Sequence, residues 1–284
     1  MGEPSRGELP FTRVGIVGLG VMGGSLARAL ARHHPYLETA GWSPDPGERE
    51  AALAAGAVGR APETLEEAIA EAELVVLGVP VDAELELLPR IAASAPEAVL
   101  SNVTSLQIPA AAVAATSTWG RRWVGSHPMV GSERSGFAAS RADLFRDARV
   151  WLIPEVADAS ARDTVRALWE GLEARPRSTS APAHDALMAR ASHFPQLAAN
   201  LVAAVLEEAG VAARDLGSGG RDMTRLAASS PELWGPLLKR AGPELSAALR
   251  SLAHQAAEVA VALEEGDVAA LERLMERTRT WKEA

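Results

Sequence analysis

Hydrophobic positions follow two alternating periodicities along the first half of the chain. Short, almost uninterrupted apolar runs such as 74–79 are typical of strands covered on both faces, whereas apolar residues three or four positions apart, as at Leu26 and Leu30, are typical of helices. The pattern predicts strands at 13–18, 38–42, 74–79, 98–102, 123–126 and 150–153, with helices within 18–34 and at 49–55, 63–71, 83–93 and 108–115. Strand–helix alternation of this kind predicts an α/β domain with a doubly wound parallel sheet.

After Pro154 the alternation stops. Long stretches rich in Ala, Leu, Glu and Arg follow, and their apolar residues, such as Leu201 and Val205, keep helical spacing. We therefore expect two domains, a Rossmann-type domain over residues 10–155 and an all-helical domain over residues 156–284.

Composition excludes several classes of function. The net charge of −9 argues against nucleic acid as a partner, and the absence of cysteine excludes disulfides, thiolate metal sites and a cysteine nucleophile. No apolar run approaches the roughly 18 residues of a membrane span, and the N-terminus has no signal-peptide core. We expect a soluble, cytoplasmic protein. Histidines and carboxylates share no short metal-ligand spacing, so no metal is expected.

The first strand leads into a glycine motif. The sequence Gly18-Leu19-Gly20-Val21-Met22-Gly23 matches GxGxxG, and it follows a strand and opens a helix. In such a motif the glycines allow a tight turn, close approach of a pyrophosphate and close strand–helix packing, while the helix N-terminus attracts the anion. The context predicts dinucleotide binding by these six residues. Val79 and Pro80, which end another strand, are expected to form a wall beside the cofactor.

The acid that usually binds the adenosine ribose is expected about 20 residues after the motif. Ser43 stands there instead. A serine accepts a phosphate that an acid repels, and Arg49 is near enough in sequence to assist, which favours NADP. Asp45 could equally bind the ribose, which favours NAD. The sequence leaves the choice open, with NAD as the expected cofactor and NADP possible.

A second candidate site follows the later strands. His127 lies in a loop of small residues, GSHPMVGSERSG, and a histidine at a strand end beside a nicotinamide pocket is suited to act as a general base. Spacing alone equally allows a solvent-exposed loop histidine. Ser105 ends a segment rich in hydroxyl groups after the preceding strand.

Four separated motifs together resemble one family. These are GIVGLGVMGGSLARAL, GSHPMVGSERSG, SHFPQ and RDMTRLA followed by Trp234. In this order they are similar to the prephenate/arogenate dehydrogenases of tyrosine biosynthesis, over about residues 13–234. The resemblance implies oxidation of the ring carbinol of prephenate or arogenate by hydride transfer to NAD(P), with loss of the ring carboxylate as carbon dioxide.

The resemblance also implies roles for individual residues. His127 corresponds to the catalytic histidine and Ser105 to a serine that orients the ring hydroxyl. The residues implied in substrate binding are His193, Arg225, Arg221, Glu133 and Trp234, with Arg221 in the place of a lysine from a second subunit. Asn102 and Thr104 replace the family's usual aspartate and glycine. The remaining histidines, His33, His34, His184 and His254, match nothing in the family and are expected to be surface or capping residues.

The helical domain implies a homodimer, because in this family such domains interlock. Two alternatives stay open. The first is another two-domain dehydrogenase, for example of the 3-hydroxyacid type, which lacks the second and fourth motifs. The second is a nucleotide-sensing module without catalysis.

Overall fold

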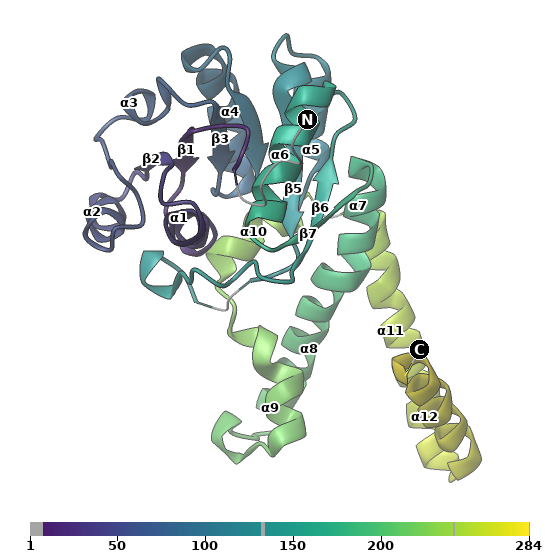
Figure 1. Ribbon diagram of the computed structural model, residues 1–284. Helices are drawn as coiled ribbons and strands as arrows, with labels where there is room; N and C mark the ends of the chain where they lie inside the picture. Colours follow the sequence, from purple (N-terminus) through teal and green to yellow (C-terminus); the bar gives the residue numbers. More distant parts are fainter. Residues whose placement is uncertain (1–7, 132–133, 241, 284) are drawn as a thin grey trace. The chain divides into compact units, whose positions relative to one another are not determined.

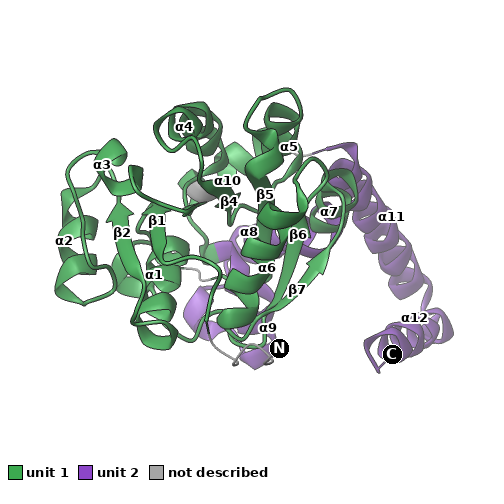
Figure 2. Ribbon diagram, turned by 45° about the horizontal axis from the view of Figure 1, so that its top comes forward, with its two compact units in different colours: residues 1–188, 228–240 green, residues 189–227, 241–284 purple. Residues whose placement is uncertain are grey.

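The computed structural model describes residues 8–131, 134–240 and 242–283 (Figure 1). The chain divides into two compact units, residues 1–188 with 228–240 and residues 189–227 with 241–284 (Figure 2).

Unit 1 is built around one sheet. Its strands are β1 (Arg13–Val17), β2 (Glu38–Trp42), β3 (Leu74–Leu77), β4 (Val99–Asn102), β5 (Trp123–Pro128), β6 (Arg149–Ile153) and β7 (Arg175–Ser178). Its helices are α1 (Val21–His33), α2 (Pro46–Ala54), α3 (Leu65–Ile69), α4 (Val81–Ser94), α5 (Ile108–Ala115), α6 (Ala159–Gly171), α7 (Ala181–Met188) and α10 (Pro231–Lys239), with 3₁₀ turns η1 (Gly120–Arg122) and η2 (Phe137–Ala139).

The strands form the order β2-β1-β3-β4-β5-β6-β7. Strands β1 to β5 pair in parallel, as the sequence predicts. Because β1 lies between β2 and β3, the chain changes direction across the sheet at β1 and β3, and ligands of such sheets bind at this switch point. Because these strands are parallel, the carboxyl ends of β1, β3, β4 and β5 all lie at the same edge of the sheet.

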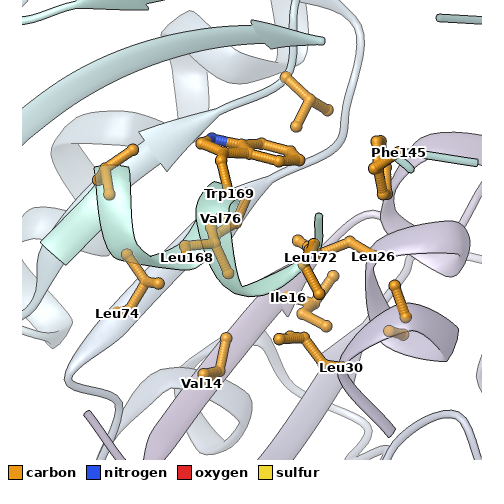
Figure 3. Close-up of a cluster of buried hydrophobic side chains, with 14 of the residues drawn as sticks. Val14, Ile16, Leu26, Leu30, Leu74, Val76, Phe145, Leu168, Trp169 and Leu172 are labelled. Atoms are coloured by element: carbon orange, nitrogen blue, oxygen red, sulfur yellow. The ribbon is translucent and has the colours of Figure 1, made fainter. Parts of the chain in front are cut away.

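Helices cover both faces of the sheet. Alternate residues of the buried strands point to opposite faces, so Val76 of β3 joins one apolar cluster and Val75 the other. The first cluster packs β1 and β3 against α1 and α6, where the rings of Phe145 and Trp169 meet edge to face at 5.2 Å (Figure 3). The second packs the sheet against α3, α4 and α5. These two layers confirm the doubly wound class.

The far side of the sheet departs from the expected pattern. Strand β6 runs antiparallel to β5. The described residues between them hold the short turn η2 and no crossover helix of the kind that a parallel connection needs. Strand β7 was not expected, since its sequence, RPRS, has no apolar run. It lies at the edge of the sheet, where a proline is tolerated. Because α6 and β7 belong to the sheet unit, this unit continues past the boundary expected near residue 155.

Unit 2 is helical. It contains the π-helical turn η3 (Ala189–His193), α8 (Phe194–Glu208), the 3₁₀ turns η4 (Ala213–Asp215) and η5 (Arg225–Ala228, whose last residue belongs to unit 1), α9 (Ser218–Thr224), α11 (Pro243–Glu265) and α12 (Val268–Glu283). Few of its side chains are buried, and α12 has none among its described residues. Large apolar side chains are exposed on these helices, including Val205, Met275 and Trp281 at 65%, 70% and 78%.

Candidate active site

The glycine motif forms the turn between β1 and α1. Gly18 has φ +91°, and a Cβ there would lie 2.6 Å from the carbonyl oxygen of Gly78. A Cβ at Gly23 would lie 1.8 Å from the carbonyl oxygen of Gly18, so both positions require glycine. Helix α1 begins at Val21 without a side-chain cap or an acid in its first turn. Its N-terminal N–H groups therefore fit the pyrophosphate of a dinucleotide.

The other residues expected at the cofactor surround this turn. Val79 and Pro80 follow β3, and Gly78 N–H donates to Val17 O over 2.7 Å, which holds the end of β3 beside the turn. Met22 is half-buried. The side chain of Leu19 is fully buried in the core, so only its backbone faces the turn.

At the end of β2, Ser43 is 2% exposed. Its Oγ donates to Glu48 Oε2 over 2.7 Å. Asp45, which the sequence offered as a ribose ligand, is instead the N-cap of α2 and accepts from Gly47 N–H over 2.8 Å. Arg49 donates from Nη1 to the Ser43 carbonyl over 2.6 Å. Sequence reasoning missed Glu48, which lies on α2 rather than at the strand end.

His127 lies on β5 and is 9% exposed. Its Nδ1 lies 2.9 Å from Nε2 of His184, whose Nδ1 lies 2.7 Å from Oδ1 of Asp185. Asp185 also accepts the backbone N–H groups of Gln107 and Ile108, each over 2.9 Å, at the start of α5. The expectation that His184 is a surface or capping residue is wrong: it is 1% exposed and joins His127 to a carboxylate.

A buried polar cluster lies beside His127. The backbone N–H of Ser126 donates to Asn102 Oδ1 over 2.7 Å, which leaves Asn102 Nδ2 to donate to Glu84 Oε1 over 2.6 Å. Thr104 Oγ1 lies 3.0 Å from Glu84 Oε2, and Gln107 Nε2 donates to the carbonyl of Ser126 over 3.1 Å. Burial raises the pKa of Glu84 to about 7, although the hydrogen bonds from Asn102 and Thr104 oppose this shift.

This cluster positions the loop that contains Ser105. The loop leaves β4 at Asn102 and reaches α5 at Ile108. Both replacements noted in the sequence, Asn102 and Thr104, belong to the cluster and bond to Glu84. Ser105 itself is half-buried. Glu84, like His184, carried no signal in the sequence beyond its place on an amphipathic helix.

The residues implied in substrate binding are divided between the units. Trp234 lies half-buried on α10 of unit 1. His193 is 2% exposed in unit 2, and Arg221 and Arg225 are exposed there on α9 and η5. Gln196, one turn after His193, donates to the carbonyl of Leu226 over 2.7 Å, which ties α8 to the turn that carries Arg225. Glu133 lies outside the described residues.

Neither a metal site nor a membrane span is found in the described part of the chain. No group of three His, Asp or Glu side chains there could hold a metal ion. None of the helices in that part is long and apolar enough to cross a bilayer.

Unit 1 has a dinucleotide-type turn and a buried histidine at one edge of a doubly wound sheet, and unit 2 is helical. These features are typical of the class of two-domain dehydrogenases. Residues 26–177 match the family model "Prephenate dehydrogenase, nucleotide-binding domain", and residues 180–277 match "Prephenate dehydrogenase, dimerization domain". The chain belongs to the prephenate dehydrogenase family.

Named relatives agree with this assignment. The chain is 32% identical to the prephenate dehydrogenase of Bacillus subtilis over 231 residues, which are 78% of this chain and 62% of that enzyme. It is 29% identical to the cyclohexadienyl dehydrogenase of Zymomonas mobilis over 269 residues, 90% of this chain and 91% of that one.

Solved structures share the fold. Prephenate dehydrogenase of Aquifex aeolicus, in complex with hydroxyphenyl propionate and NAD⁺, superposes with a TM-score of 0.82 at 23% identity, covering 97% of this chain and 99% of that one. Arogenate dehydrogenase of Synechocystis gives a TM-score of 0.76 at 24% identity, with 95% and 99% coverage.

Proposed function

We propose that this chain oxidises the ring carbinol of prephenate or arogenate, with NAD as the hydride acceptor and loss of the ring carboxylate as carbon dioxide. The observation that carries the proposal is the hydrogen-bonded series His127–His184–Asp185 at the sheet edge that also holds the glycine turn. This series supports a role for His127 as the proton acceptor.

The assignment follows from donors and acceptors. Backbone N–H groups only donate, so the carboxylate of Asp185 acts as the acceptor toward Gln107 and Ile108. It accepts equally from Nδ1–H of His184, which leaves Nε2 of a neutral His184 as an acceptor. Nδ1 of His127 must then carry the proton that lies between the two rings. The lone pair of His127 is therefore on Nε2.

His127 Nε2 takes the proton of the ring hydroxyl as the carbinol carbon becomes a carbonyl. Bound NAD supplies the acceptor for the hydride that leaves this carbon. The electron pair of the bond to the departing carboxylate passes into the ring, which becomes aromatic. His127 returns its proton to the ring oxygen, so the product is a phenol and no net proton is released. His184 and Asp185 are positioning residues, since they act through His127.

Other residues orient the two ligands. Ser105 holds the ring hydroxyl, in a loop fixed by the buried cluster around Glu84 and Asn102. The family resemblance assigns Arg225, Arg221, His193, Glu133 and Trp234 to the substrate. The N-terminus of α1, with Gly18, Gly20 and Gly23, holds the pyrophosphate, and Val79 and Pro80 flank the cofactor.

The active form in this proposal is a homodimer. Support comes from the match to a dimerization domain over residues 180–277 and from the apolar side chains exposed on α8, α11 and α12. Apolar surface of this extent is normally covered by a partner.

The test is an absorbance assay of the reduced cofactor with prephenate and arogenate, each with NAD and NADP. Turnover of one of the two substrates, reduced about 10²–10⁴-fold in kcat by His127→Asn, is expected. A protein that binds NADH but turns over neither substrate would refute the proposed reaction. That result would favour a 3-hydroxyacid dehydrogenase or a nucleotide sensor.

A further inference from the structure

The residue after β2 determines whether a dinucleotide-binding chain binds the 2′-hydroxyl or the 2′-phosphate of the adenosine ribose. The Trp42 carbonyl accepts from Gly18 N–H over 2.7 Å, so the end of β2 lies directly beside the glycine turn. An acid at this place normally accepts from the ribose 2′-hydroxyl. Here the side chain is that of Ser43, which is 2% exposed and already donates its hydroxyl proton to Glu48.

Glu48 brings a carboxylate to the same place from a different element. It lies in the first turn of α2, and Ser43 Oγ fixes its Oε2 at 2.7 Å. Its other oxygen, Oε1, lies 3.9 Å from the position that a Cβ on Gly20 would occupy. Among the described residues, no other atom beyond Gly20 and its chain neighbours comes within 4 Å of that position. The carboxylate therefore borders the open side of the turn.

Asp45 and Arg49, the other two candidates for this place, have hydrogen bonds to the backbone. Asp45 caps α2 through Gly47 N–H. The Arg49 guanidinium donates to the Ser43 carbonyl, on the backbone and not on the side chain. Arg49 thus lies at the Ser43 backbone, whereas Glu48 is the side chain that approaches the position of a Cβ on Gly20.

We propose that Glu48, held by Ser43, binds the adenosine ribose of the cofactor and makes this chain select NAD over NADP. A carboxylate accepts a charge-assisted hydrogen bond from a ribose 2′-hydroxyl, whereas it repels the charge of a 2′-phosphate. Ser43 is a positioning residue in this arrangement, and it does not serve as a phosphate ligand. The proposal rests on the NAD use proposed above, but it is independent of which substrate is oxidised.

The experiment measures binding of NADH and NADPH to the full-length protein by cofactor fluorescence, without substrate. Glu48→Gln removes the charge and keeps the shape, and Ser43→Ala removes the group that holds Glu48. Glu50→Gln is the matched control, because Glu50 is an exposed acid on the same helix. Thermal unfolding of each variant verifies that it is folded.

The unmodified chain is expected to bind NADH at least about 10-fold more tightly than NADPH, since a hydrogen bond to a charged group contributes about 10- to 100-fold. Glu48→Gln should reduce this ratio at least fivefold by weakening NADH and tightening NADPH. Ser43→Ala should reduce it less, and Glu50→Gln should leave it unchanged.

Equal binding of the two cofactors by the unmodified chain would overturn the proposal. A ratio unchanged by Glu48→Gln would also overturn it. Selective NADH binding without turnover of prephenate or arogenate would instead leave the role of Glu48 intact and refute the proposed reaction.

Discussion

Replacing Asp185 with asparagine tests the tautomer assigned to His127. Asparagine has one oxygen and one NH₂ group where Asp185 has two acceptors. If its oxygen faced His184, its NH₂ would face the N–H of Ile108 and leave that donor unsatisfied, at a cost of about 1–3 kcal/mol. If its NH₂ faces His184, its oxygen takes the place of Oδ2, where it accepts from Ile108 N–H at 2.9 Å and from Gln107 N–H at 3.2 Å, while the shorter bond from Gln107 to Oδ1 is lost. The proton of His184 then moves to Nε2, and the proton of His127 must move from Nδ1 to Nε2.

The second arrangement removes the lone pair that accepts the substrate proton. At 1.4 kcal/mol per factor of ten, the cost of the first arrangement alone favours the inactive tautomer about 5- to 150-fold, and the weaker bond from Gln107 in the second places the expected ratio toward the lower end of that range. Asp185→Asn is therefore expected to lower kcat by about this factor. KM and the affinity for NADH should change little, because Asp185 is expected to touch neither ligand.

Steady-state kinetics with the preferred substrate, together with NADH fluorescence, provide the measurement. Asp143→Asn is the control, because Asp143 is an exposed acid paired with Arg141 on the surface of the same unit. A kcat within twofold of the unmodified enzyme would refute the reasoning. A rise in KM alone would show that Asp185 acts on the shape of the site and not on the proton of His127.

Three further predictions follow from the buried groups and the exposed helices. Burial raises the pKa of Glu84 from 4.5 to about 7. Between these pH values the folded chain keeps the proton and the unfolded chain loses it. The free energy of unfolding should therefore fall by up to about 3 kcal/mol as the pH rises from 4.5 to 7. Denaturant unfolding at several pH values should show a smaller decrease for Glu84→Gln, and an equal decrease would contradict the assignment. Gly23→Ala should weaken NADH binding at least about 10-fold, as measured by fluorescence, because its Cβ would displace the carbonyl of Gly18. Light scattering should give twice the chain mass of 29.8 kDa, and a monomer at micromolar concentration would contradict the proposed homodimer.

Local patterns were sufficient to predict the parallel strands β1 to β5 and the glycine turn. The order strand, GxGxxG, helix is contained within 13–34. Gly18 and Gly23 are needed because a Cβ there would collide with the backbone of Gly78, just after β3, and with that of Gly18. Strand β7 escaped prediction because an edge strand needs little apolar sequence, and RPRS has only one buried side chain.

Local patterns could not predict hydrogen-bond partners that lie far apart in the sequence. His184 meets His127 across 57 positions, and Asp185 meets Gln107 across 78. A histidine followed by an acid on a helix is common on protein surfaces, so the sequence HD alone does not indicate burial. Glu48 is a different case, because it is only five positions from Ser43. The glycine motif predicts the ribose-binding acid at the end of the strand, whereas Glu48 lies on the following helix.

Asn102 shows how a departure from a family pattern can be explained once its neighbour is known. An aspartate at this position would place a second carboxyl group against Glu84, where Asn102 Nδ2 now lies at 2.6 Å. Two carboxylates at that distance do not both ionise in a buried site, so the pKa of one of them would be raised further. Asparagine instead donates to Glu84 while its oxygen still accepts from Ser126 N–H, the residue before His127. The amide on β4 thus keeps the acceptor that an aspartate would supply to Ser126 N–H on β5, and Glu84 carries the buried carboxyl of the cluster.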